Sequence, residues 1–241
     1  VTPIASRISP APVDKFTLEQ PESVSITGLS DKITTNTFDY GASYAQVRIH
    51  NGQFLHNHGF RGEGMQMAFM DAGYYHYDLL PTFDSIRNNN QILGTWDFVN
   101  REISVSEDNS HGMNCLSTVA ANMPGVFVGT APKTSFYLFR TEDVASEYPI
   151  EEHNLSVGAE RADSAGVDIC SVSLGYNLFS DPSFDYTYND MNGNTSISAR
   201  AVDIAAKKGM LIVVAAGNEG NNSWHYISTP ADADSCMAVG A

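Results

Sequence analysis

Hydrophobic positions along the chain fall into short runs that alternate with longer segments of helical periodicity. The short runs are bounded by turn residues, which is typical of buried strands, and the longer segments place apolar residues three or four positions apart. Strands rich in Val and Ile on both faces, joined by helices, are typical of a parallel sheet covered on both sides. The pattern therefore predicts an α/β fold, a three-layer α/β/α sandwich with a mainly parallel central sheet. Strands are expected at 65–70, 92–99, 135–140, 167–174, 210–216 and 235–241, and helices at 111–123, 151–165 and 197–208.

Turn and capping residues mark the boundaries of these elements. Ser110 precedes the first of the three helices and is expected to cap it, while Gly166 and Gly209 are expected to end the other two. The segment 177–194 is polar, aromatic and punctuated by glycine. It predicts a long connection of the kind that is often functional.

The N-terminal segment differs from the rest of the chain. Residues 1–39 are rich in Pro, Ser and Thr and show no sustained apolar periodicity, which predicts a linker or the tail of a propeptide. Residues 40–241 are expected to form one domain. Because the chain begins with Val1, we expect that a preceding segment has been removed.

Composition and charge narrow the classes of partner. The chain of 241 residues is 42% hydrophobic and carries 13 basic and 28 acidic residues, for a net charge of −15. This balance makes nucleic acid an unexpected partner, because neutralising phosphates requires a basic face. The sequence predicts no transmembrane segment. Three cysteines, far apart, predict neither a disulfide framework nor a zinc site.

Three short motifs carry the candidate chemistry. Asp71 ends an apolar run, His111 follows Asn-Ser and precedes Gly112, and Asn218 follows a second apolar run within Ala-Ala-Gly-Asn-Glu-Gly. In parallel sheets, reactive groups gather at the carboxyl ends of the strands, where Asp71 and Asn218 are expected. Taken singly, Asp71 could cap a turn and Asn218 could occupy a left-handed turn position. Their order and context favour a functional site.

In this order the motifs resemble the Asp, His and oxyanion-hole Asn motifs of the subtilisin-like serine peptidases. The helix at His111 is also followed by Gly-Thr-Ala-Pro and a strand, as in that family. The resemblance implies that Asp71 orients His111, that His111 is general base and then general acid, and that Asn218 stabilises an oxyanion. It covers the chain from about residue 40 onward.

The resemblance also implies a substrate-binding region. Ser173, Leu174 and Gly175 match a strand end that forms one wall of the S1 pocket and pairs with extended polypeptide. Gly217 lets the backbone approach a substrate, and Glu219 falls where the S1 pocket is lined. A carboxylate there could favour a basic or polar P1 residue, or could lie solvated at the pocket mouth. After His111, Asn114 and Ser117 depart from the family pattern, and Cys115 matches a position where some members carry a free thiol.

The nucleophile motif of the family, Gly-Thr-Ser followed by small residues and Pro, does not occur in residues 1–241. The resemblance therefore implies a serine endopeptidase that acts through an acyl-enzyme, with this chain a fragment that ends before the nucleophile and is inactive by itself. The alternative is a non-catalytic pseudo-peptidase that serves as a peptide-binding module. A further alternative is an unrelated α/β domain that binds a small ligand, for which the order of the three motifs would have no significance.

Cofactor and location follow from the resemblance alone. No cofactor or catalytic metal is expected, although a structural calcium ion is possible in this family. Glu102, Glu107 and Asp108 are acidic candidates for such an ion, without a recognisable loop pattern. The expected partner is a polypeptide in extended conformation. The expected location is extracytoplasmic or secreted, with no signal segment seen in the sequence.

Overall fold

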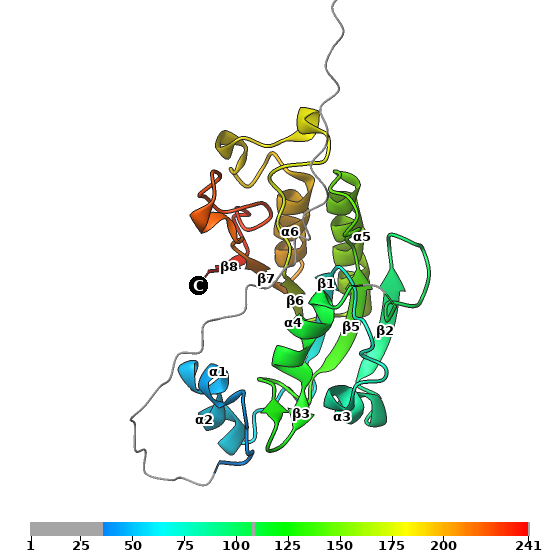
Figure 1. Ribbon diagram of the computed structural model, residues 1–241, viewed down its shortest axis with the longest axis vertical. Coiled ribbons are helices and arrows are strands. Elements are labelled where there is room, and N and C mark those ends of the chain that lie inside the picture. Colours follow the sequence, from blue (N-terminus) through cyan, green and yellow to red (C-terminus); the bar gives the residue numbers. More distant parts are fainter. Residues whose placement is uncertain (1–35, 108, 241) are drawn as a thin grey trace, which may run out of the picture.

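A six-stranded parallel sheet forms the centre of the computed structural model, in which residues 36–107 and 109–240 are described. Its order is β2-β5-β1-β6-β7-β8, with β1 in the interior between β5 and β6 (Figure 1). Every neighbouring pair is parallel. The strands are β1 (Gln66–Asp71), β2 (Ile92–Asp97), β5 (Ser135–Arg140), β6 (Ile169–Val172), β7 (Leu211–Ala215) and β8 (Met237–Val239).

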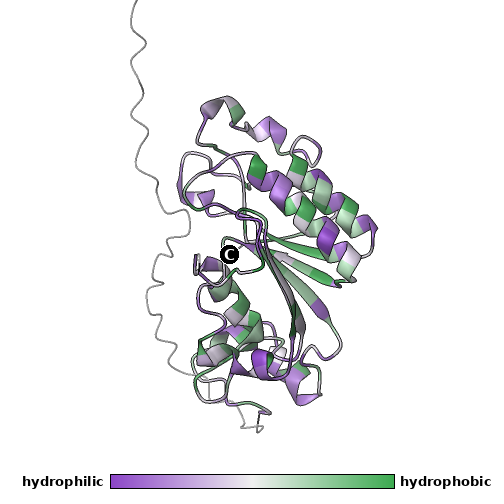
Figure 2. Ribbon diagram, turned by 90° about the vertical axis from the view of Figure 1, so that its right-hand side faces the viewer, coloured by the Kyte–Doolittle hydropathy of each residue, from purple (hydrophilic) through white to green (hydrophobic). Residues whose placement is uncertain are grey.

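Helices cover both faces of the sheet, as Figure 2 shows, so the predicted three-layer α/β/α fold is confirmed. One face packs against α5 (Ile150–Ala165) and α6 (Ile197–Lys207) through residues such as Met70, Leu155 and Val202. The other face packs against α3 (Asp84–Asn88) and α4 (His111–Ala120) through residues such as Phe69 and Leu116. The burial of both faces accounts for the continuous apolar character of the strands.

Short elements complete the described chain. The helices α1 (Tyr44–Ile49) and α2 (Gly52–Asn57) precede the sheet, and β3 (Asn122–Met123) and β4 (Phe127–Val128) form an antiparallel hairpin. Single 3₁₀ turns are η1 (Pro81–Phe83), η2 (Pro182–Phe184), η3 (Tyr188–Asp190) and η4 (Glu219–Asn221). No helix of the described part has the length and apolar character needed to cross a bilayer.

A buried carboxylate fastens α5 to the start of α6. Glu152 on α5 is fully buried, and its Oε2 accepts hydrogen bonds from the backbone N–H and the hydroxyl of Ser198, at 3.0 and 2.7 Å. Its Oε1 accepts one from the Tyr186 hydroxyl at 2.7 Å, in the long connection 177–194. The pair of helices and this connection are therefore held together by one charged group.

Several predicted boundaries were wrong. The strand predicted over 92–99 ends at Asp97, and the strand predicted over 235–241 is observed at Met237–Val239. The helix predicted over 111–123 ends at Ala120, because the chain turns into the β3–β4 hairpin, and Met123 precedes Pro124, a position that disfavours helix. The strand predicted over 167–174 ends at Val172, so 173–175 follow it as irregular backbone. The predicted ends at Gly166 and Gly209 are confirmed, since both residues take positive φ, Gly166 directly after α5 and Gly209 after Lys208, the residue that follows α6. The linker or propeptide prediction falls mainly on residues 1–35, which lie outside the described part.

Candidate active site

Asp71 is carried to the carboxyl edge of the sheet by the interior strand β1. Its side chain is 1% exposed. Its Oδ1 accepts hydrogen bonds from the Ala72 backbone N–H at 2.7 Å and from Nδ1 of His111 at 2.6 Å. In the sheet, β1 lies between β5 and β6, which follow one another along the chain. From β1 the chain continues to strands on one side, and from β5 it crosses to strands on the other side, so the order of the strands switches at β1. Ligand sites of open α/β sheets form at such points.

His111 is the first residue of α4, and the glycine after it explains how the helix reaches Asp71. A Cβ on Gly112 would lie 2.6 Å from the Gly73 carbonyl oxygen and 2.8 Å from Asp71 Cβ. Only a residue without a side chain allows α4 to begin this close to the turn after β1.

The predicted capping role of Ser110 was wrong. Ser110 has helical backbone angles, and its side chain makes no capping hydrogen bond. The side chain of Asn109 does this instead, because its Oδ1 accepts the backbone N–H of His111 at 2.7 Å. His111 therefore lies at a capped helix N-terminus, and the capping side chain is that of Asn109, one residue earlier than predicted.

The carboxylate of Asp71 favours the charged form of His111. Burial alone disfavours the imidazolium, but the hydrogen bonds and charges of Asp71 and Cys115 outweigh it and raise the pKa of His111 to about 10. In this arrangement Nδ1 of His111 carries a proton for Asp71, which leaves Nε2 for chemistry.

Asn218 lies at the end of β7, across the sheet edge from this pair. The turn that carries it uses Gly217 at φ +110°, while Asn218 itself has φ −113°. The alternative interpretation of Asn218 as a left-handed turn residue is therefore wrong, since Gly217 supplies the positive φ. The Asn218 side chain is exposed and lines the same cavity as His111.

A cavity of about 560 Å³ lies between these groups. His111 and Asn218 line it together with all the residues predicted to bind substrate, namely Ser173, Leu174, Gly175, Gly217 and Glu219. Asp71 does not line it, because it is buried behind the imidazole. The structure thus brings seven of the eight predicted site residues to one cavity, and the eighth, Asp71, is hydrogen-bonded to His111 behind the cavity wall.

Comparison with known proteins identifies the family of this chain. A family profile described as the Subtilase family, Peptidase S8, matches residues 24–241. The chain belongs to the subtilase family. The match begins within the predicted linker or propeptide tail, so a boundary at residue 40 stays a prediction.

Individual subtilases are related at moderate identity. The chain is 30% identical over 243 residues to an alkaline protease of Alkalihalobacillus alcalophilus, covering 99% of this chain and 54% of that protein. It is 32% identical over 189 residues to subtilisin Savinase of Lederbergia lenta, covering 77% and 58%. It is 28% identical over 194 residues to the minor extracellular protease Vpr of Bacillus subtilis, covering 76% and 21%. The crystal structure of MycP1 from Mycobacterium smegmatis superposes with a TM-score of 0.57 at 19% identity, covering 87% of this chain and 58% of that one.

The chain therefore spans about half the length of the first two relatives and less of the third. The MycP1 likeness shows the subtilase fold alone.

Departures from the usual subtilase helix are accommodated locally. The Ser117 hydroxyl donates to the Asn114 backbone carbonyl at 2.7 Å, within the regular turns of α4. Cys115 is half-buried, with Sγ 4.0 Å from Nδ1 of His111.

Glu219 is half-buried and folds back onto its own turn. Its Oε2 accepts the Asn218 backbone N–H at 2.6 Å and lies 3.4 Å from the Ser228 hydroxyl. The carboxylate remains part of the cavity wall. Glu219 thus faces the cavity and also accepts a hydrogen bond from the Asn218 turn.

Two of the three candidate calcium ligands, Glu102 and Glu107, lie in the described residues. Glu107 Oε2 accepts hydrogen bonds from Ser104 and Ser106, and Asp108 lies outside the described residues. A structural calcium ion at this place stays a prediction.

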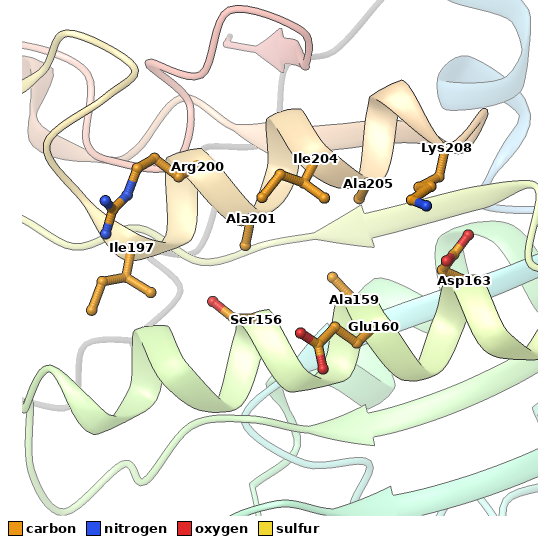
Figure 3. Close-up of a pocket in the computed structure, with 10 residues that line it drawn as sticks. All are labelled: Ser156, Ala159, Glu160, Asp163, Ile197, Arg200, Ala201, Ile204, Ala205 and Lys208. Atoms are coloured by element: carbon orange, nitrogen blue, oxygen red, sulfur yellow. The ribbon is translucent and has the colours of Figure 1, made fainter.

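The sequence motifs missed part of the cavity wall. Glu142 and Glu147 follow β5, and Asn177, Leu178 and Trp224 come from the two loops around the cavity. None belongs to a short motif, because their proximity arises from the parallel arrangement of the strands. A separate groove of about 500 Å³ lies between α5 and α6 (Figure 3), and none of the predicted site residues lines it.

Proposed function

We propose that this protein is a serine endopeptidase of the subtilisin type, which hydrolyses peptide bonds through an acyl-enzyme. The observation that carries the proposal is the 2.6 Å hydrogen bond between Asp71 and His111 beside a cavity that Asn218 also lines. Family membership supports it.

Each group has a defined role in the proposed reaction. The serine hydroxyl attacks the substrate carbonyl carbon while His111 Nε2 takes its proton. The C–N bond breaks as His111 returns that proton to the leaving amine, and water then releases the acyl group by the same route. Asp71 holds the imidazole in the correct tautomer. Asn218 donates to the oxyanion, a contact worth about 3 kcal/mol of transition-state stabilisation in such enzymes.

The nucleophile is not among the three motifs. Residues 1–241 contain no Gly-Thr-Ser segment, and the chain spans about half of its relatives' length. We place the serine outside these 241 residues and expect the 241-residue chain to be inactive by itself.

The proposed substrate is a polypeptide in extended conformation that pairs with 173–175. Glu219 in the cavity wall would favour a basic or polar P1 side chain. Neither a cofactor nor nucleic acid has a part in this proposal. An extracytoplasmic location is proposed by analogy with the relative named as an extracellular protease.

Fluorophosphonate labelling tests the proposal. The 241-residue chain is compared with a chain extended to the natural C-terminus of its gene, each with and without His111→Ala. Labelling of the extended form, lost in His111→Ala, is the expected result. If the extended chain folds and does not label, the proposal fails and the peptide-binding pseudo-peptidase replaces it.

A further inference from the structure

Three charged side chains end neighbouring strands at the edge of the sheet that carries the site. The parallel register pairs Asp71 of β1 with Arg140 of β5, and Arg140 in turn with Asp97 of β2. Only Asp71 belongs to a recognised motif. Arg140 is 5% exposed and Asp97 is fully buried, so both charges lie inside the protein.

Arg140 is held in a defined orientation. Its Nη1 donates to Asp97 Oδ2 at 2.8 Å, and its Nε donates to the Ala72 backbone carbonyl at 3.2 Å. The other oxygen of Asp97 accepts the backbone N–H groups of Val99 and Asn100, at 2.7 and 2.8 Å. Asp97 is therefore held by the backbone of its own turn. The planar Arg140 guanidinium binds Asp97 on one side and the Ala72 carbonyl on the other, which fixes its orientation.

Ala72 connects this ion pair to the site. Its carbonyl accepts from Arg140, while its N–H donates to the Asp71 oxygen that also accepts from His111. The Asp71 carbonyl accepts the Thr141 N–H at 2.9 Å, which fixes the other side of the same turn. The N–H and the C=O of Ala72 belong to successive peptide groups joined at its Cα, and Arg140 holds the second of them. A change in the Ala72 backbone angles after loss of the Arg140 hydrogen bond would therefore move the N–H that orients the Asp71 carboxylate.

We propose that Arg140, anchored by Asp97, is a positioning residue that sets the orientation of the Asp71 carboxylate through Ala72 and thereby the geometry of the Asp71–His111 pair. A buried ion pair is often no more stabilising than apolar side chains of the same volume. Its directed hydrogen bond to Ala72 is what an apolar replacement could not supply. The inference deepens the proposed function, and its first test is independent of peptidase activity.

The test is an NMR titration of His111 in the 241-residue chain, assigned with His111→Gln. The main variant is the double substitution Asp97→Asn with Arg140→Met, which removes both buried charges together. Asp71 and Cys115, which face His111, and Tyr74, which faces Asp71, stay unchanged. We expect the pKa of His111 to fall by about one unit, because a less well oriented carboxylate stabilises the imidazolium less.

A matched control separates positioning from general destabilisation. Glu152→Ala removes a buried charge at the α5–α6 contact, remote in its hydrogen bonds from Asp71. It should lower the melting temperature and leave the pKa of His111 unchanged. Arg140→Lys keeps the charge without the planar fork and should give a smaller fall, and it provides the readout if the double variant does not fold.

An unchanged pKa of His111 in a folded double variant, or an equal fall in Glu152→Ala, would overturn the proposal. In the extended chain the double variant should lose about tenfold in kcat with little change in KM, since Arg140 does not line the cavity. Failure of the extended wild-type chain to react would count against the proposed function alone, because the NMR titration does not depend on it.

Discussion

Gly112 shows how a single missing side chain sets the position of an imidazole. An added Cβ would meet the Gly73 carbonyl oxygen and the Asp71 side chain at 2.6 and 2.8 Å, and the first of these is a backbone atom with little freedom to move. Gly112→Ala should therefore destabilise the fold by about 1–3 kcal/mol, despite the better helix propensity of alanine.

Urea denaturation of the 241-residue chain measures this effect. Gly220→Ala is the matched control, because its added Cβ would meet nothing within 4 Å and its φ is not positive. Equal stability of the two variants would mean that α4 can shift away from the turn without loss.

The protonation of His111 gives a second prediction at this scale. Its pKa is raised to about 10, above the ordinary 6.5, by the hydrogen bond and charge of Asp71 against the opposing effect of burial. Protonation of His111 therefore contributes stability that is fully present below about pH 6.5 and is lost as the pH rises through about 10. For the proposed general-base role the pH dependence is opposite, since the neutral form of His111 becomes more populated only as the pH rises.

Asp71→Asn should lower the pKa of His111 toward or below 6.5, as read from the imidazole resonances, and should remove the corresponding slope from the pH dependence of stability. Asp190→Asn removes one negative charge on the exposed η3 turn and should leave both unchanged. A His111 that titrates near 6.5 in the unmodified chain would contradict the prediction.

At the level of elements, Glu152 joins α5 to α6 and to the long connection between β6 and α6. Glu152→Ala would leave the Ser198 N–H and hydroxyl and the Tyr186 hydroxyl without their buried acceptor. We expect a loss of about 3 kcal/mol in the free energy of unfolding. Glu160→Ala, on the exposed part of the same helix, should change stability by less than about 0.5 kcal/mol, and a similar loss in both would refute the assignment.

Elements that are marked by a local sequence pattern could be predicted from the sequence. All six strands of the sheet were predicted, because apolar runs bounded by turn residues report burial on both faces. The placement of Asp71 followed from the rule that strand ends gather chemistry. Arg140 ends a predicted strand as well, whereas the strand that holds Asp97 was predicted to continue to residue 99. Without the order of the strands in the sheet there was no reason to bring Arg140 and Asp97 together.

Other features depend on contacts that no local pattern encodes. The end of the helix at Ala120 is set by the β3–β4 hairpin, and the cap of His111 comes from Asn109 although Ser110 is an equally good capping residue type. Glu142 and Trp224 join the cavity wall only because parallel crossovers bring their loops to one edge. Sequence periodicity carries no information on these loop conformations.

At the scale of the whole molecule, the central sheet should behave as one cooperative unit, and Cys170 reports on it. This thiol lies in β6, between β1 and β7, with 0% exposure, and burial raises its pKa to about 12. Neither solvent access nor thiolate formation is available in the folded state. Alkylation of Cys170 therefore requires opening of the sheet itself.

Iodoacetamide labelling at pH 8, followed residue by residue by mass spectrometry, measures that opening. Cys170 should stay unmodified in native buffer. The logarithm of its alkylation rate should rise with urea concentration as steeply as that of global unfolding. Cys236, half-buried outside the strands, is the internal reference and should react with a weaker dependence on urea. If Cys170 reacts in native buffer at the rate of Cys236, then β6 opens locally, and the cavity wall that continues from it at 173–175 is not the rigid surface that extended-substrate pairing requires.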